Sequence, residues 1–169
     1  YLYFGLESKS GYSNSVDKKW WEFDISCFGH RSIMNDVTAA MALEQLKKLP
    51  SFIERRKAIH DHYCARLSEI SWLDIPVQLP EYCTSSYYFY PIQTKNDERD
   101  LLAKHLRENN IYTTYRYFPL HRVKAYGCDE SFANADWAAD HTLCLPIHQS
   151  LTQDEIDYIC DKIIEYGKK

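Results

Sequence analysis

Arg31 lies in a short basic loop, residues 28–36, that leads directly into an amphipathic segment. Gly29 permits a close or left-handed backbone that bulkier residues resist, and Asn35 or Asp36 can cap the helix that follows. A guanidinium beside the start of a helix is well placed to bind an anion. Arg31 is therefore the first candidate binding residue. The alternative is an exposed arginine of the common surface kind.

Three further side chains with useful chemistry gather in one later stretch of the chain: Arg116, Tyr117 and His121. An arginine can bind a phosphate group through two parallel hydrogen bonds, and a histidine can hydrogen-bond a substrate or move a proton near neutral pH. The alternative is structural: Tyr117 fills the edge of a core and His121 caps a turn. His148 is open to the same two interpretations.

Six cysteines are scattered along the chain without a Cys-x-x-Cys pair. Disulfide frameworks are typical of short secreted chains, so reduced and mostly buried thiols are expected. His60 and Cys64 lie four residues apart on an expected helix, with His62 between them, and could share a metal ion. Two ligands do not complete a tetrahedral site, so no metal is predicted.

The composition limits the class of protein. The chain has 169 residues, 45% of them hydrophobic, and a net charge of -4. This is enough for one domain with a core, and the charge does not favour nucleic acid as a partner. The aromatic residues 82–90 could stack on bases, but the charges around them are mostly acidic, so a core strand is the better interpretation. No apolar run approaches the roughly 20 residues that span a bilayer and no signal peptide is recognisable, so we expect a cytoplasmic protein that does not bind membranes.

An α/β arrangement of helices packed on a small sheet must position these side chains. Apolar residues recur every three positions over residues 37–49 and predict one helix, which Pro50 separates from a second helix at about 51–70. The second helix is expected to bury one set of side chains and to turn another toward water: Phe52, Ile59, Tyr63, Leu67 and Ile70 in the first set, and Glu54, Arg55, Arg56 and Lys57 in the second.

The rest of the chain predicts alternating strands and helices. Strands are expected near residues 20–25, 73–76, 86–93 and 111–117. Asp97 is expected to cap a helix that Asn109 and Asn110 end, and a further helix and strand follow. The last helix begins with a capping box and buries one face: Thr152 and Glu155 form the box, and Ile156, Ile159, Cys160, Ile163 and Ile164 form the face.

Three blocks of the sequence resemble one known family in order and spacing. Residues 29–36 have the form Gly-x-x-x-x-Met-x-Asp and precede an Ala-Ala and a Gln-Leu. Residues 110–121 are similar to "Gly-Ile-x-Thr … Tyr-x-Pro-Leu-His", and residues 143–152 to "Leu-Pro-x-His-x-x-Leu-Thr". From about Trp20 to its end, the chain resembles the C-terminal part of the DegT/StrS family of pyridoxal-phosphate-dependent sugar aminotransferases.

The resemblance implies the small C-terminal domain of a fold-type I pyridoxal-phosphate enzyme. Residues 1–35 would be a loop-rich segment from the end of the large, cofactor-binding domain. Residues 36–169 would be the small domain with its leading interface helices.

The resemblance also implies the chemistry. The cofactor would be pyridoxal 5'-phosphate, the substrate a keto-sugar nucleotide, the amino donor an amino acid such as glutamate, and the assembly a homodimer. Arg31 stands where many members have an asparagine that reaches the cofactor phosphate of the neighbouring subunit. Ile33 stands at the family's later arginine position, so a second basic contact is in doubt. Arg116 would bind the nucleotide diphosphate, with Tyr117 and His121 near the sugar.

The catalytic lysine of that family precedes the first block, and only 28 residues precede Gly29 here. Lys9, Lys18 and Lys19 lie in a polar stretch, whereas a nucleophilic lysine needs desolvation or a neighbouring cation. We therefore expect no catalytic residue in this chain and a partner N-terminal half that carries the lysine. The chain would be a fragment or one half of a split enzyme, inactive alone. Two alternatives remain: a sugar dehydratase of the same family, in which a histidine replaces the lysine, and a non-catalytic α+β interaction module.

Overall fold

The computed structural model describes residues 34–168 of the chain. Contacts within the chain divide it into two units, residues 1–48 and residues 49–169. The expected strand at residues 20–25 lies outside the described residues, as does most of the expected loop-rich segment 1–35. That assignment of domains stays a prediction.

The first helix, α1 (Asp36–Leu67), begins where the sequence predicts. Oδ1 of Asn35 accepts a hydrogen bond from the backbone N–H of Thr38 at 2.9 Å. This satisfies one of the amide groups that a helix leaves free at its first turn, so Asn35 is the N-cap.

Pro50 lies inside α1, so the prediction of two helices separated by this proline is wrong. Proline removes the hydrogen bond to the carbonyl four residues earlier, which belongs to Leu46. Pro50 and Leu46 are exposed, and water can replace the missing donor there. The helix-forming residues on both sides carry the helix through the proline.

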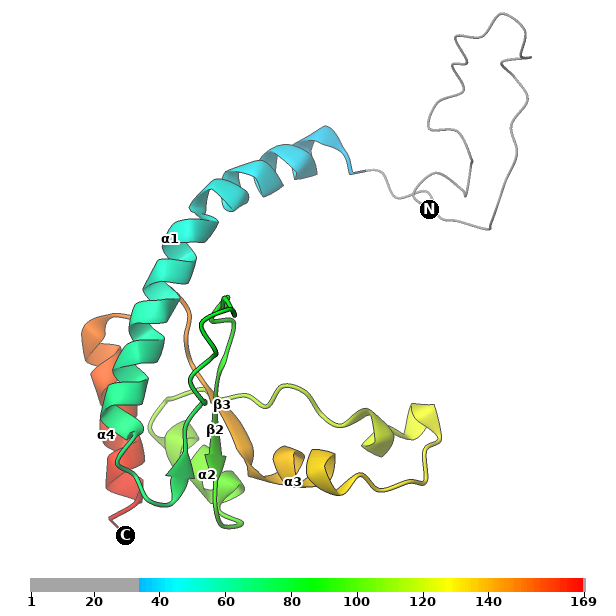
Figure 1. Cartoon of the computed structure of the whole chain (residues 1–169), viewed down its shortest axis with the longest axis vertical. Coiled ribbons are helices and arrows are strands. Elements are labelled where there is room, and N and C mark those ends of the chain that lie inside the picture. Colours follow the sequence, from blue (N-terminus) through cyan, green and yellow to red (C-terminus); the bar gives the residue numbers. More distant parts are fainter. Residues whose placement is uncertain (1–33, 169) are drawn as a thin grey trace, which may run out of the picture. The chain divides into compact units, whose positions relative to one another are not determined.

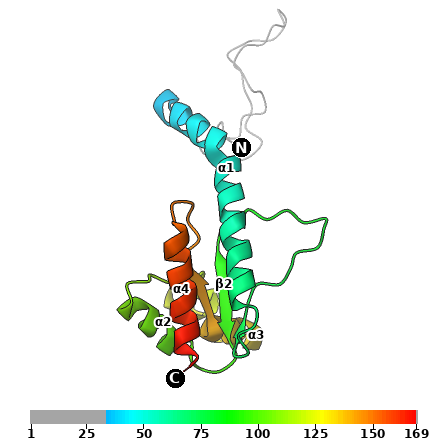
Figure 2. The same ribbon diagram turned by 90° about the vertical axis from the view of Figure 1, so that its left-hand side faces the viewer.

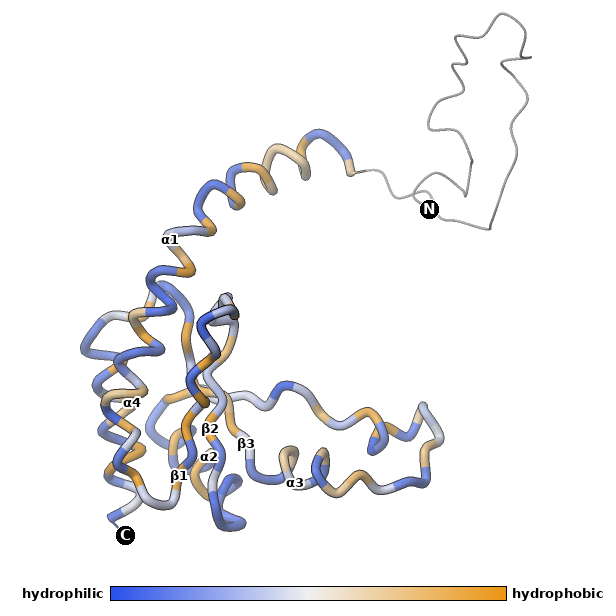
Figure 3. The backbone as a smooth tube through the Cα atoms, in the orientation of Figure 1, coloured by the Kyte–Doolittle hydropathy of each residue, from blue (hydrophilic) through white to orange (hydrophobic). Residues whose placement is uncertain are grey.

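The first part of α1 leaves its apolar side chains exposed. Hydrophobic residues recur from its first turns onward (Figure 3), and Val37 is 71% and Leu46 is 62% exposed. The later part buries Ile59, Tyr63 and Leu67, as predicted. The hydrophobic pattern therefore predicts the helix in both parts. Among the described residues, only the later part packs its apolar side chains against other elements.

The sheet has three strands in the order β1-β2-β3, and all its pairings are antiparallel. The strands are β1 (Leu73–Asp74), β2 (Tyr90–Thr94) and β3 (Thr142–Leu145). Helices packed on a small sheet were expected. Antiparallel pairing makes the domain α+β, which corrects the expected α/β class.

Helices α2 (Arg99–Glu108), α3 (Ala133–His141) and α4 (Gln153–Tyr166) complete the regular structure, together with the short 3-10 turns η1 (Leu120–Arg122) and η2 (Lys124–Tyr126). Figures 1 and 2 show α4 beside the C-terminal part of α1, and hydrogen-bonded ion pairs from Arg66 to Asp157 and Asp161 join the two helices. The core lies between these helices, α2 and the sheet, and includes Tyr63, Ile92, Leu106, Leu145 and Ile163.

The last helix matches its prediction closely. Thr152 is the N-cap, and Thr152 and Glu155 form the complete capping box. The expected face is buried except at Ile164, which is half-buried. Short-range signals of this kind depend only on neighbouring residues, which is why the sequence alone reveals them.

Three local predictions are wrong. Residues 111–117 form no strand, because only Thr114 pairs with a strand residue, Cys144, through an isolated bridge. Asp97 does not cap α2, whose N-cap is Glu98 without a side-chain hydrogen bond. The strand expected at residues 86–93 begins only at Tyr90, so the aromatic residues before it do not form a core strand.

The end of α2 does match, since Asn110 has a left-handed φ of 62°. No helix in residues 34–168 is long and apolar enough to cross a membrane.

Candidate functional site

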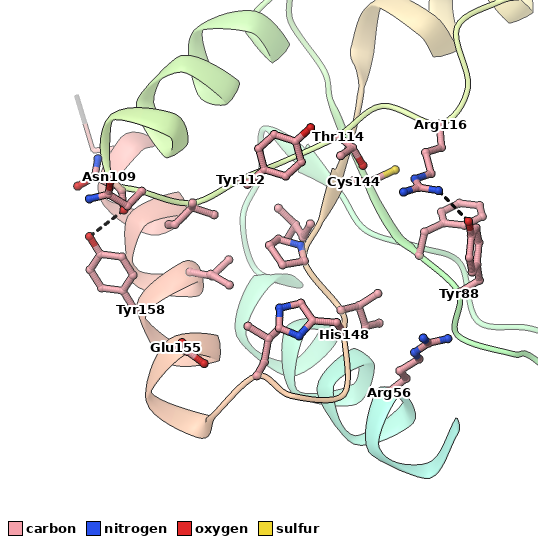
Figure 4. A pocket seen from close by; sticks show the side chains of 18 residues that line it. Arg56, Tyr88, Asn109, Tyr112, Thr114, Arg116, Cys144, His148, Glu155 and Tyr158 are labelled. Carbon is pink, nitrogen blue, oxygen red and sulfur yellow. Dashed lines mark hydrogen bonds between the residues drawn. The ribbon is translucent and has the colours of Figure 1, made fainter. Parts of the chain in front are cut away.

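A cavity of about 690 Å³ opens on the unit formed by residues 49–169. It lies among α1, the segment before β2, the segment after α2, the end of β3 and α4 (Figure 4). Its walls combine two arginine side chains with aromatic ones: Arg56 and Arg116, and Tyr88, Tyr112, His148 and Tyr158. Such a lining suits a ligand with both anionic and planar apolar groups.

Arg116 reaches this cavity because the backbone beside it is fixed to β3. Thr114 and Cys144 exchange backbone hydrogen bonds of 3.2 and 2.7 Å, and Arg116 follows two residues later. Its Nη1 donates to the phenol oxygen of Tyr88 at 2.7 Å, and its guanidinium lies 5.5 Å from the centre of the Tyr88 ring. Arg116 therefore has a defined position although its side chain is exposed.

Tyr117 lies with Arg116 and Tyr88 but does not line the cavity. The guanidinium of Arg116 lies 6.0 Å from the centre of the Tyr117 ring. The hydrogen bond with Tyr88, and to a smaller extent the one with Arg116, lowers the pKa of the Tyr117 phenol. Tyr117 is 67% exposed, so the structural alternative of a core edge is wrong for it. The structure thus brings two of the three residues predicted for this stretch together.

Glu155 also lines the cavity, but its carboxylate is engaged. Oε2 accepts hydrogen bonds from the backbone N–H of Thr152 at 2.8 Å and from its hydroxyl at 3.0 Å. The backbone bond is the main reason that the pKa of Glu155 is lowered. His148 lies in the middle of the cavity in Figure 4 and is exposed, which favours the binding interpretation over the structural one.

The turn that carries His148 is tied to α1 on both sides. The Tyr63 hydroxyl donates to the carbonyl of Pro146 at 2.8 Å, and Nη2 of Arg55 donates to the carbonyl of Leu151 at 2.6 Å. Burial raises the pKa of Tyr63, so this phenol stays a neutral donor. Arg55 was predicted to point to water, and this contact corrects that prediction.

Arg56 is the functional candidate that sequence reasoning missed. It was also predicted to point to water, but it is half-buried and lines the cavity. Its Nη2 lies 3.4 Å from Oε1 of Gln149, and its Nε is buried without a hydrogen-bond partner among the described residues. Arg56 and Arg116 lie 60 positions apart in the sequence, so no local signal could have paired them.

His121 lies away from the cavity, in the arm that we define as residues 117–132. Its Nε2 is 2.8 Å from Oδ1 of Asp136, and its ring packs on Phe132 with centroids 5.1 Å apart. Arg122 donates to Asp136 at 2.6 Å and binds Asp140 through two hydrogen bonds of 2.7 and 2.9 Å. His121 therefore lies in a hydrogen-bonded group outside the cavity, and its expected contact with the substrate stays a prediction.

Asp136 is the centre of this second group. It also accepts hydrogen bonds from the Ser131 hydroxyl at 2.9 Å and from the backbone N–H of Phe132 at 3.0 Å. The hydrogen bond with His121 is the largest cause of the strongly lowered pKa of Asp136. We call His121, Arg122, Asp136 and Asp140 the arm cluster.

His60 and Cys64 do not form a metal site with a third ligand within residues 34–168. Cys64 Sγ lies 3.8 Å from His60 Nδ1 and 3.4 Å from the Tyr90 hydroxyl. The His60 ring packs edge-on against Tyr87 and Tyr90. The five described cysteines are free.

Arg31 lies outside the described residues, so its role as a cofactor ligand stays a prediction. Among residues 34–168, no lysine lines the cavity. Most of these lysines lie on the surface in ion pairs with carboxylates, such as Lys57 with Asp61 and Lys95 with Asp74. The described cavity therefore offers cations for an anion but no lysine for a covalent bond to a cofactor.

The fold is that of a small α+β domain, and its cavity has arginine side chains that suit an anionic ligand. The chain belongs to the DegT/DnrJ/EryC1/StrS aminotransferase family, whose model matches residues 5–164.

Individual relatives agree with this membership. A dTDP-4-dehydro-2,3,6-trideoxy-D-glucose 4-aminotransferase of Saccharopolyspora spinosa is 40% identical over 161 residues, which are 95% of this chain and 42% of the relative. A dTDP-4-dehydro-2,6-dideoxy-D-glucose 3-dehydratase of the same organism is 26% identical over 157 residues, 88% of this chain and 34% of the relative.

Among solved structures, the aminotransferase TlmJ from Streptoalloteichus hindustanus superposes with a TM-score of 0.78 at 42% identity. The match covers 89% of this chain and 41% of that structure. The chain therefore spans about two fifths of the length of these two aminotransferases and about a third of the dehydratase.

Proposed function

We propose that this chain supplies the C-terminal part of a pyridoxal-phosphate-dependent aminotransferase that acts on a keto-sugar nucleotide. The observation that supports the proposal most is the match of the family model to residues 5–164, together with 40% identity to a sugar aminotransferase. The bound cofactor would supply the electron sink for amino transfer. This chain's own residues would bind and orient the anionic groups.

The proposal assigns the catalytic lysine to a separate N-terminal half. Since no described lysine lines the cavity, the isolated chain should form no covalent bond with pyridoxal phosphate. The test adds pyridoxal phosphate, reduces with borohydride and maps the adducts by mass spectrometry. Stoichiometric labelling of one lysine would mean that the active site has been assigned to the wrong chain.

Reconstitution tests the reaction itself. The chain is mixed with a partner half that contains the lysine, and the cofactor absorbance band is recorded. A keto-sugar nucleotide and glutamate are then added, and one equivalent of 2-oxoglutarate per amino sugar is expected. Absence of both the band and the reaction would favour a non-catalytic interaction module.

A sugar dehydratase is the second candidate, and the 26% identity to a 3-dehydratase supports it. The higher identity to the aminotransferase favours amino transfer. In the reconstituted enzyme, loss of water from the sugar without formation of 2-oxoglutarate would identify the dehydratase.

For Arg31 we propose a contact with the cofactor phosphate of a neighbouring subunit. A hydrogen bond between charged groups contributes about 1.5 to 3 kcal/mol, so Arg31→Ala should weaken cofactor retention roughly ten- to a hundredfold in the reconstituted enzyme. Arg107→Ala is the matched control, because Arg107 is exposed and no carboxylate in residues 34–168 forms an ion pair with it. Arg55 is unsuitable as a control, since it binds the Leu151 carbonyl. Equal cofactor affinity in both variants would make Arg31 a surface residue.

The proposed assembly is a homodimer that uses the first part of α1. Its exposed apolar side chains, among them Val37, Met41, Leu43 and Leu46, support this, because soluble proteins usually cover such surface. The isolated chain should self-associate and become well behaved with its partner half. A strictly monomeric, cooperatively melting chain in analytical ultracentrifugation would count against this assembly.

A further inference from the structure

Arg116 was already expected to bind the nucleotide diphosphate. We propose that Arg56 completes a two-guanidinium site with it at the Tyr88 end of the cavity, and that both cations together hold a diphosphate group of the ligand. The inference rests on the proposed function for the identity of the ligand, but the site itself is argued from the contacts below. Arg56, Tyr88 and Arg116 are called the cavity cluster.

The guanidinium groups of Arg56 and Arg116 belong to the same wall of the cavity. Both line it, and Figure 4 shows them on either side of Tyr88. Arg116 donates to the Tyr88 hydroxyl at 2.7 Å. The hydrogen bond with Tyr117 raises the pKa of Tyr88, and the positive charges of Arg116 and Arg56 oppose that rise, so both charges act on one phenol.

Neither cation is neutralised. Within residues 34–168, neither Arg56 nor Arg116 forms an ion pair with a carboxylate. Three other arginines of the described residues do form such ion pairs: Arg66, Arg99 and Arg122. Glu155 is the carboxylate that lines the cavity, and the backbone and hydroxyl of Thr152 already occupy it. Two unpaired positive charges on one wall favour a ligand with at least two negative charges.

The neighbouring arginine provides an internal comparison. Arg55 is satisfied by a 2.6 Å hydrogen bond to the Leu151 carbonyl, whereas the Arg56 guanidinium has a 3.4 Å contact with Gln149 and a buried Nε without a described partner. Buried donors are nearly always paired in folded proteins, so an unpaired one requires an explanation. A bound anion explains it.

The kind of anion follows from the rest of the wall. Phosphate oxygens accept paired hydrogen bonds from guanidinium groups, and aromatic rings at the cavity can pack against a planar group attached to the phosphates. Tyr112 and Tyr158 supply such rings beyond the cavity cluster. A diphosphate with an attached ring therefore fits better than the carboxylates of an amino donor.

The experiment titrates the 169-residue chain with inorganic pyrophosphate and, separately, with glutarate, using isothermal titration calorimetry. It requires neither the cofactor nor the lysine-bearing half, so its outcome is independent of the test of the proposed function. Arg56→Gln and Arg116→Gln should each weaken pyrophosphate binding about tenfold. Lys104→Gln is the control, because it removes the same charge from an exposed site on α2.

Three results would overturn the proposal: unchanged pyrophosphate binding in Arg56→Gln, no binding by the native chain up to on the order of 10 mM, or glutarate binding as tight as pyrophosphate binding. Thermal melting checks that each variant folds. If Arg56→Gln melts early, Arg56→Lys replaces it, because an ammonium keeps the charge but cannot form the two parallel bonds of a guanidinium. Native pyrophosphate affinity in Arg56→Lys would then contradict the site.

Discussion

The cavity cluster and the arm cluster both contain arginine, but only Arg122 of the arm cluster is paired with carboxylates among the described residues. In the arm cluster, Arg122 and His121 meet two carboxylates at distances of 2.6 to 2.9 Å. In the cavity cluster, Arg116 meets a phenol, and Arg56 has only a long contact with an amide. Paired cations fix the path of the chain, and cations without carboxylates remain available to a ligand. Whether a basic side chain is available to a ligand therefore depends on whether a carboxylate of the protein pairs with it, and not on its residue type.

The largest effect should come from the cavity cluster in the reconstituted enzyme. Arg116→Gln should lower kcat/KM for the keto-sugar nucleotide about tenfold, because a hydrogen bond between charged groups is lost, and should leave the melting temperature unchanged. Steady-state kinetics and thermal melting measure both quantities. Arg122→Gln is the matched control, with the reverse pattern expected. If both arginines change kcat/KM equally, the division into two clusters fails.

Asp136→Asn should have the next largest effect, on the stability of the arm. The amide cannot accept all the hydrogen bonds that His121, Arg122, Ser131 and Phe132 direct to the carboxylate. The melting temperature should fall by several degrees, and hydrogen exchange should accelerate in residues 120–140. Asp129→Asn, at an exposed position of the arm, should change neither quantity.

The arm cluster should also make stability depend on pH. Asp136 has a pKa lowered from its ordinary value of 3.8, so the unfolded chain binds a proton more readily than the folded chain. The stabilisation is present above about pH 4 and is lost as the pH falls further. Melting temperatures from pH 6 to pH 3 should therefore fall more steeply for the native chain than for Asp136→Asn. Parallel slopes would show that other carboxylates govern acid unfolding.

Thr152→Ala should have the smallest effect, and it would make the cavity cluster more like the arm cluster by freeing a carboxylate near its arginines. Loss of the N-cap costs about 1 kcal/mol of stability. It also removes the hydroxyl that binds Glu155, which lines the cavity and would then be freer to approach its cations. Pyrophosphate binding should weaken a few-fold in Thr152→Ala and remain native in Thr152→Ser, which keeps the hydroxyl.

The sequence predicts those features that neighbouring residues determine. The Asn35 cap, the capping box of Thr152 and Glu155, and the left-handed Asn110 all depend on a few consecutive positions. The block containing Arg116 and Tyr117 was likewise recognisable by its spacing, and Arg116 lines the cavity whereas Tyr117 does not. The family membership follows from three such blocks.

Features that depend on distant partners could not be predicted. His121 was expected near the sugar, but the fold brings it to Asp136, fifteen residues later and outside the cavity, and nothing in the sequence around His121 indicates that contact. The sequence around Arg56 predicts a solvated helix residue, but in the fold Arg56 lines the same cavity as Arg116. Pro50 is a helix breaker in isolation, yet exposed carbonyls around it can be hydrated and the helix continues.

The turn that carries His148 is held to α1 through the carbonyls of Pro146 and Leu151. Its backbone has therefore lost conformational freedom during folding, before any ligand arrives. Ordering a residue's backbone at binding would cost roughly 1 to 2 kcal/mol, and this cost is largely avoided here. A ligand that contacts His148 needs to order only the side chain, so its affinity is reduced little by entropy.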